Sequence, residues 1–106
     1  MPRPQEDAVV RRLQSALIAI YGDRLERAVL FGSRVRGEAR ADSDYDVAVF
    51  LRDFHGLWEE AGPLAEAATE ILLDTGAVLN AIPFPAGAYQ SRTALMGEIR
   101  REGIDL

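Results

Sequence analysis

Two apolar segments joined by a short polar connection constrain the fold of this chain most. Residues 28–31 (Ala-Val-Leu-Phe) close on Gly32-Ser33, and ten residues later Asp44-Tyr45-Asp46 opens the second segment, residues 47–51 (Val-Ala-Val-Phe-Leu). Short runs of β-branched and aromatic residues bounded by glycine and polar residues are typical of strands. The second run is mostly apolar, which indicates a strand buried on both faces. The sequence therefore predicts two strands, with a small turn set beside two carboxylates.

The spacing of the two aspartates places them on one face of their strand. Side chains alternate between faces, so Asp44 and Asp46 share one face while Tyr45 and Val47 take the other. Their Cα atoms are expected about 6.5–7 Å apart. A magnesium ion with oxygen ligands at about 2.0–2.1 Å fits between two carboxylates that lean toward each other. Two acids on one face repel, so a cation or an arginine is expected nearby.

The turn before the polar connection is suited to phosphate. Gly32 permits backbone angles and a close approach that a Cβ would forbid. Ser33 can cap a short helical turn whose free N–H groups face a phosphate. The connection carries Arg34, Arg36 and Arg40, and guanidinium groups bind phosphate oxygens through paired hydrogen bonds. This segment therefore combines groups for phosphate with groups for a cation.

The same segment resembles a known family. Residues 30–37 (Leu-Phe-Gly-Ser-Arg-Val-Arg-Gly) followed by residues 42–47 (Asp-Ser-Asp-Tyr-Asp-Val) resemble the signature of the minimal nucleotidyltransferases of the DNA polymerase beta superfamily. That signature is Gly-Ser, ten residues and Asp-x-Asp, and residues 98–104 resemble the closing helix of such domains. The resemblance covers nearly the whole chain. It implies the α/β (α+β) fold of DNA polymerase beta, a small mixed sheet of three to four strands flanked by helices.

The resemblance also implies roles for individual residues. Asp44 and Asp46 would be the catalytic pair that binds one or two magnesium ions bridging the triphosphate of ATP. Gly32 and Ser33 would hold the β- and γ-phosphates, and Arg34 and Arg36 would stabilise the charge on the nucleotide. An acceptor hydroxyl would then attack the α-phosphorus, and magnesium pyrophosphate would leave.

The predicted third strand departs from the pattern of the superfamily. Active members place a third carboxylate there, which joins the metal cluster and helps to deprotonate the attacking hydroxyl. Asn80 is the only polar side chain of residues 77–83 (Ala-Val-Leu-Asn-Ala-Ile-Pro). An amide can ligate a metal through its oxygen but cannot accept a proton as a general base. Asp74, just before the strand, is a weaker candidate for that position. The departure puts catalysis in question more than nucleotide binding.

Three functions follow, and the sequence leaves them open. The leading hypothesis, by resemblance, is transfer of AMP from ATP to a partner protein of the HEPN type, with the chain acting as the antitoxin of the pair. The alternative is an inactive, nucleotide-binding antitoxin that neutralises its partner by forming a complex. A weaker option is a dimeric enzyme that modifies a small molecule in a cleft between subunits. The sequence does not choose between a homo-oligomer and a hetero-oligomer.

The remaining apolar periodicities predict alternating helices and strands. Residues 6–21 form an amphipathic stripe that ends at Gly22, and residues 57–74 form a second helix that Pro63 is expected to interrupt. Gly76 ends this second helix. The remaining predicted elements are strands over residues 26–31, 44–51 and 77–84 and a last helix over residues 91–102.

Composition narrows the class of protein. The 106 residues suit one domain spanning residues 1–106, and the net charge of −5 argues against a general affinity for nucleic acid. The absence of cysteine excludes a disulfide framework and thiolate metal sites. We find no apolar run long enough for a membrane span and no signal-peptide layout, so a cytoplasmic location is expected.

Three side chains outside the motif have ordinary interpretations. His55 is the sole histidine and is expected in a solvated turn. Trp58 is expected to anchor the following helix as a partly buried aromatic residue. Glu59 and Glu60 are expected on a solvated helix face.

Overall fold

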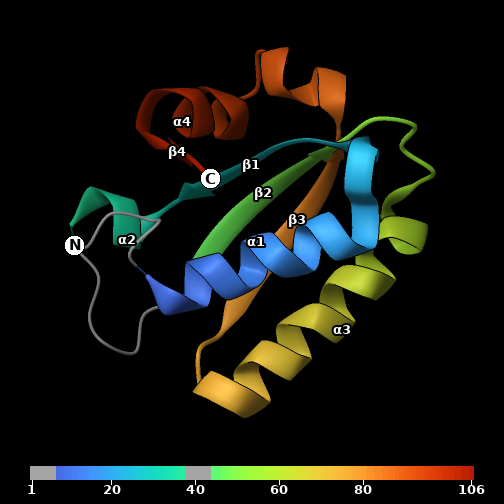
Figure 1. The fold of residues 1–106 in the computed structure, drawn as a ribbon. Helices are drawn as coiled ribbons and strands as arrows, with labels where there is room; N and C mark the ends of the chain where they lie inside the picture. The colour runs from blue at the N-terminus through green and yellow to red at the C-terminus, as the bar shows by residue number, and fades with distance from the viewer. Residues whose placement is uncertain (1–6, 38–43) are drawn as a thin grey trace.

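The computed structural model describes residues 7–37 and 44–106, which form a mixed α/β fold around one four-stranded sheet (Figure 1). The start of the first predicted helix and the motif residues Arg40 and Asp42 lie outside the described residues. The helices are α1 (Ala8–Tyr21), α2 (Ser33–Arg36), α3 (Leu57–Thr75) and α4 (Ala94–Glu102), with 3₁₀ turns η2 (Gly22–Arg24) and η3 (Ala86–Gln90). The strands are β1 (Leu25–Phe31), β2 (Tyr45–Leu51), β3 (Leu79–Pro85) and β4 (Ile104–Asp105).

The sheet has the strand order β3-β2-β1-β4. Strand β1 runs antiparallel to β2 and to β4, whereas β2 and β3 are parallel and connected through α3. Strand β2 is therefore internal, and its last five residues are fully buried. This confirms the prediction of a strand with both faces covered, because each face must be apolar where helices pack on it.

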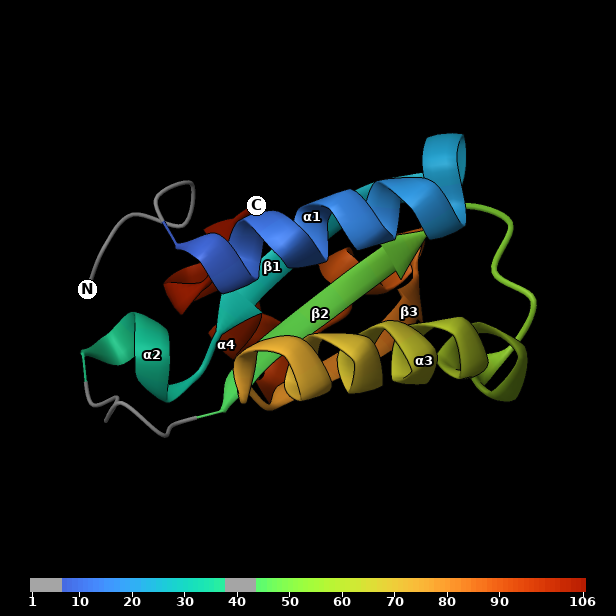
Figure 2. The same ribbon diagram turned by 60° about the horizontal axis from the view of Figure 1, so that its bottom comes forward.

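Helices cover the two faces of the sheet unequally. Helices α1 and α3 lie side by side over one face, while α4 and η3 lie over the other (Figures 1 and 2). The first face holds the larger core, in which Leu13 and Leu17 of α1 and Ile71 of α3 contact the buried strand residues. On the opposite face Phe50 stacks on Phe84, with ring centroids 5.5 Å apart. The sheet is thus a rigid support for residues at the ends of its strands.

Helix α3 corrects one expectation. Pro63 does not interrupt it, because the helix is continuous from Leu57 to Thr75. Its buried stripe includes Leu64 and Ile71, and tertiary packing of this kind outweighs the local cost of a proline. The helix ends at Gly76 in the left-handed region, as the sequence predicts.

The residues at the start of α3 differ most from the sequence prediction in how exposed their side chains are. Trp58 is 84% exposed and does not anchor the helix, whereas Glu60 is only 3% exposed. Glu60 forms an ion pair with Arg24 and accepts a hydrogen bond of 3.1 Å from the backbone N–H of His55. Burial opposes the charged form, but these donors outweigh it and lower the pKa of Glu60. Glu60 is therefore a structural link between α3 and η2.

The C-terminal part also differs in detail from the expected helix over residues 91–102. Helix α4 begins at Ala94, because the Thr93 hydroxyl caps it by accepting a hydrogen bond of 3.1 Å from the N–H of Met96. Turn η3 precedes this helix, and β4 follows it. No helix within the described residues is both long enough and apolar enough to span a membrane.

Candidate functional site

The candidate site lies where the end of β1 meets the start of β2. Phe31 pairs with Asp46 in the antiparallel register, so Gly32, the next residue, is carried beside the Asp46 side chain. A Cβ on Gly32 would lie 2.5 Å from Oδ2 of Asp46. Gly32 also has a φ of +84°, a conformation that other residues rarely adopt. Both the contact and the backbone angle therefore require glycine at this position.

Ser33 begins the short helix α2 directly after this glycine. The N–H groups of Val35 and Arg36 donate to the carbonyl of Gly32 at 3.1 and 3.2 Å, which closes the turn. The first N–H groups of such a turn have no acceptor within the helix. Helix α2 lies at the end of the sheet where β2 starts (Figure 2). The backbone of Gly32, just before this turn, thus lies against the Asp46 carboxylate.

Asn80 completes the cluster from the neighbouring strand. The parallel register places it beside Asp46, and its Nδ2 donates to Oδ2 of Asp44 at 2.9 Å and to Oδ1 of Asp46 at 3.3 Å. The two aspartates therefore lie on one face of the sheet, with an oxygen of each close to a single nitrogen. Tyr45, between them, points to the opposite face, where it is buried.

The two described arginines of the connection are already engaged by the protein. The guanidinium of Arg34 lies 3.8 Å from the centroid of the Tyr45 ring, and Arg36 lies 3.2 Å from a carboxylate oxygen of Glu98 and 3.7 Å from one of Glu102. The Tyr45 hydroxyl donates to Asp7 at 2.8 Å, and burial together with Asp7 raises the pKa of Tyr45. These contacts could not be predicted from the sequence, because most of them join segments far apart in the chain.

Other polar candidates lie away from the cluster. Asp74 forms an ion pair with Arg12 of α1 and does not occupy the third-carboxylate position. His55 follows the opposite end of β2. Among residues 7–37 and 44–106, no group of three or more histidine, aspartate, glutamate or cysteine side chains could share a metal ion. Two carboxylates are therefore the oxygen ligands that these elements bring together, and the Asn80 amide faces both of them with its Nδ2.

This donor set fits one hard divalent cation. Magnesium prefers carboxylate and amide oxygens and keeps several waters, so it needs only one or two carboxylates from the protein. An oxygen of Asp44 and an oxygen of Asp46 already converge on one atom of Asn80, and both residues are accessible to solvent. Asp44 and Asp46 would hold the ion, and it would supply charge neutralisation for a polyphosphate.

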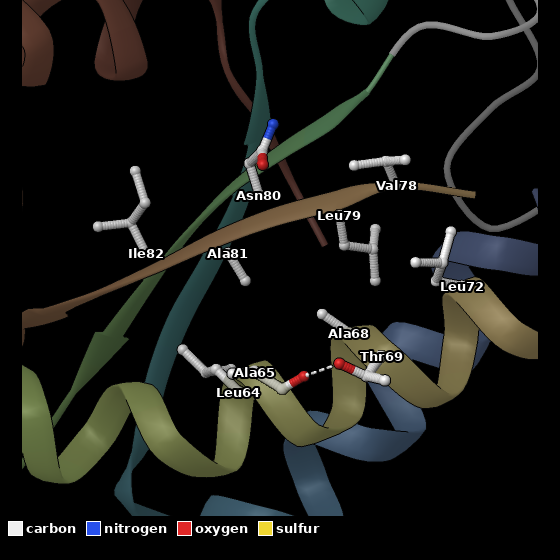
Figure 3. A pocket seen from close by; sticks show the side chains of 10 residues that line it. All are labelled: Leu64, Ala65, Ala68, Thr69, Leu72, Val78, Leu79, Asn80, Ala81 and Ile82. Carbon is white, nitrogen blue, oxygen red and sulfur yellow. Dashed lines mark hydrogen bonds between the residues drawn. The ribbon is translucent and has the colours of Figure 1, made fainter. Parts of the chain in front are cut away.

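A separate groove of about 620 Å³ runs beneath the edge strand β3, against α3. Figure 3 shows Leu79 and Ala81 pointing from β3 toward α3, while Asn80 and Ile82 point to the other side of the strand. Its lining is apolar apart from Asn80 and Thr69, so it offers no cationic group for a triphosphate. The groove adjoins the carboxylate cluster only through Asn80.

The glycine-serine turn beside the aspartate pair, at the end of a mixed sheet, has the layout that the resemblance to the nucleotidyltransferases implies. Comparison with known families agrees, because the family described as "Polymerase beta, Nucleotidyltransferase" matches residues 17–104. The chain therefore belongs to the polymerase beta nucleotidyltransferase family, and the resemblance noted in the sequence is confirmed at this level.

Two proteins of Methanocaldococcus jannaschii are similar over most of the chain. The protein named Putative protein adenylyltransferase MJ0141 is 22% identical over 98 residues, which cover 92% of this chain and 95% of that protein. The one named Putative protein adenylyltransferase MJ0604 is 30% identical over 77 residues, covering 73% and 71% respectively.

Solved structures share the fold. A chain from a crystal structure of a toxin-antitoxin with AMP-PNP superposes with a TM-score of 0.64 at 19% identity, over 90% of this chain and 69% of that one. A chain from a mutant of the toxin-antitoxin MntA-HpeT gives the same TM-score at 17% identity, with the same coverage.

Proposed function

We propose that this chain is a magnesium-dependent nucleotidyltransferase that transfers AMP from ATP to a hydroxyl group of a partner protein. The observation that carries the proposal is the close approach of Gly32 to Asp46 beside the Asp44–Asp46 pair. The membership of the nucleotidyltransferase family supports the reaction class. The names of the two archaeal relatives support a protein as the acceptor.

The proposed roles combine the resemblance to the minimal nucleotidyltransferases with the geometry of the site. Asp44 and Asp46 would hold the magnesium ion, which would supply charge neutralisation for the triphosphate. The Gly32-Ser33 turn binds phosphate oxygens through backbone N–H groups and the Ser33 hydroxyl. By the resemblance, Arg34 and Arg36 stabilise the charge that develops on the phosphates. This role requires the two guanidinium groups to exchange their contacts with Tyr45, Glu98 and Glu102 for phosphate oxygens. The acceptor hydroxyl gives its proton to water or to a base on the acceptor protein, and its oxygen forms a bond to the α-phosphorus. The bond between the α-phosphorus and the oxygen that bridges it to the β-phosphorus breaks, and pyrophosphate leaves.

The proposed partner is a HEPN-type protein toxin in the cytoplasm, which the chain neutralises as its antitoxin. This follows the resemblance to the minimal nucleotidyltransferases, and the structural neighbours come from toxin-antitoxin complexes. A protein acceptor would supply the hydroxyl that attacks the α-phosphorus.

The absence of a carboxylate at residue 80 favours a second function. An antitoxin that neutralises its partner by complex formation alone needs no base and no transfer step. In that case Asp44 and Asp46 retain nucleotide binding, and catalysis is lost.

Incubation of the chain with ATP, Mg²⁺ and a HEPN-type partner tests the two functions. Transfer predicts that the intact mass of the partner increases by one or more AMP groups and that Asp44→Asn with Asp46→Asn abolishes the increase. Asp23→Asn is the matched control, because Asp23 lies in η2 at the opposite end of the sheet. An unchanged partner mass, with equal protection by the wild type and the double variant, contradicts transfer and favours complex formation.

A further inference from the structure

Asn80 occupies an unusual place for a neutral side chain. Its Nδ2 lies between the two aspartates, 2.9 Å from Oδ2 of Asp44 and 3.3 Å from Oδ1 of Asp46. Ionised carboxylates only accept hydrogen bonds, so the NH₂ end of the amide must face them. Each of its two N–H bonds is therefore available to a different carboxylate.

This arrangement offsets a repulsion that the sheet itself creates. Asp44 and Asp46 project from the same face, each with an oxygen close to the same nitrogen, and two carboxylates held this near each other repel. A donor shared between them reduces that cost and aims an oxygen of each toward one point. The amide performs this function without adding charge.

The charge count limits what the cluster can bind. Two carboxylates balance the charge of one divalent cation, and a second cation at about 3.5–4 Å would have to share these same two carboxylates, with only phosphate oxygens and water as its further ligands. Within the described ranges, 7–37 and 44–106, no third acidic or histidine side chain joins the group. Asn80 holds the position from which the neighbouring strand would supply one.

We propose that Asn80 is a positioning residue that holds Asp44 and Asp46 together in the cation-free state and limits the site to one divalent cation. This inference rests on the proposed function, because it concerns the same cation. In the loaded site the two aspartates are ligands, so neither remains as a proton acceptor for the acceptor hydroxyl. That proton passes to water or to a base on the acceptor protein.

Binding of Mn²⁺ in the presence of AMP-PNP tests the inference. Isothermal titration, with electron paramagnetic resonance of free Mn²⁺, is expected to count one ion for the wild type and two for Asn80→Asp. Ile82→Asp is the matched control, because Ile82 lies on the same side of β3 as Asn80 (Figure 3) but makes no hydrogen bond to Asp44 or Asp46. This control is expected to remain at one ion.

Calorimetric melting without nucleotide provides a second readout that does not depend on activity. In chelator, Asn80→Asp should melt at a lower temperature than the wild type, because a third carboxylate adds repulsion. Mn²⁺ should raise its melting temperature by more than it raises that of the wild type. Asn80→Ala should also melt lower in chelator, since it removes both hydrogen bonds, and it should still bind one ion.

The outcomes separate this inference from the proposed function. Two ions in the wild type, or one ion in a folded Asn80→Asp variant, would overturn the inference and leave nucleotidyl transfer intact. No Mn²⁺ bound by the wild type would overturn both. If Asn80→Asp does not fold even with Mn²⁺, the number of Mn²⁺ ions bound by the wild type and by Asn80→Ala is the test. More than one ion in either protein contradicts the proposed limit of one cation.

Discussion

At the scale of single residues, the site depends on the absence of a side chain as much as on the aspartates. Gly32 combines a positive φ with a contact that brings the backbone against Asp46. Gly76 has nearly the same φ, +77° against +84°, but nothing lies within 4 Å of the position that its Cβ would take. The two glycines differ in ψ, −156° at Gly32 and −1° at Gly76, so Gly76 is a control for a positive-φ glycine away from the site and not for the full backbone strain at Gly32.

Gly32→Ala should reduce the affinity for AMP-PNP with Mg²⁺ by at least about tenfold, because Asp46 must move to admit the methyl group. Gly76→Ala should lower the free energy of unfolding by about 1 kcal/mol but leave the affinity for AMP-PNP unchanged. Isothermal titration and chemical denaturation measure the two quantities. Equal loss of nucleotide affinity in both variants would show that the contact with Asp46 is irrelevant.

The sequence predicted the shared face of Asp44 and Asp46 because side-chain alternation is a local property of a strand. It also singled out Asn80 as the only polar side chain of the third strand. It could not predict the hydrogen bonds from Asn80 to both aspartates, because these depend on the parallel register that α3 sets between β2 and β3.

At the scale of elements, the contact between α1 and α3 concentrates titratable groups in the interior. The hydroxyl of Tyr21, at the end of α1, donates to the backbone carbonyl of Glu60 at 2.8 Å. Burial, with a smaller contribution from the charge on Glu60, raises the pKa of Tyr21 to about 12. The neighbouring ion pair between Glu60 and Arg24 lowers the pKa of Glu60. Stability should therefore depend on pH at both extremes.

On the alkaline side, Tyr21 should make the protein less stable as pH rises from about 10 to about 12. A raised pKa in the folded state contributes stability below the unfolded pKa and loses it as pH passes through the folded one. Tyr21→Phe should remove this part of the dependence and cost about 1 kcal/mol at neutral pH through the lost hydrogen bond. Tyr45→Phe is the control for the other buried tyrosine. Urea denaturation at several pH values measures both effects, and a wild-type slope that survives in Tyr21→Phe would contradict the assignment.

On the acidic side, Glu60 should contribute stability that is lost as pH falls through its lowered folded pKa. Glu60→Gln should therefore destabilise the protein at neutral pH by about 2–3 kcal/mol, because Arg24 loses its buried partner, and the difference should shrink in acid. Glu59→Gln is the matched control, since Glu59 is next to Glu60 in the chain but exposed. Equal unfolding free energies for the two variants at neutral pH would contradict a structural role for Glu60.

The elements that sequence reasoning missed share a physical cause. Turn η3 and strand β4 are too short to show a hydrophobic period, so only their tertiary partners reveal them. Glu60 resembles the solvated Glu59 in sequence, and only the approach of Arg24 makes its burial possible. The predicted interruption at Pro63 rested on the general tendency of proline to break helices, but the packing of α3 outweighs this tendency.

At the scale of the whole molecule, the fold gathers the chemistry at one end of the sheet. The end of β1 and the starts of β2 and β3 meet there, with helix α2 beside them (Figures 1 and 2). The two layers of helices bury the sheet on both faces. The core that they form with the sheet holds the strand ends in place without packing contributions from the site residues. The order of helices and strands was predictable from apolar periodicity. The arrangement of the strands, with β2 between one antiparallel and one parallel neighbour, was not.

In the proposed site, one cation joins Asp44 and Asp46 to a triphosphate bound at the Gly32-Ser33 turn. Anomalous diffraction from crystals of the wild-type chain grown with Mn²⁺ and AMP-PNP would locate both the cation and the nucleotide. We expect a single manganese peak with oxygen ligands from Asp44, Asp46 and the triphosphate, whose phosphates contact Gly32 and Ser33. A nucleotide bound elsewhere, for example in the groove between α3 and β3, or a manganese ion without these aspartates, would contradict it.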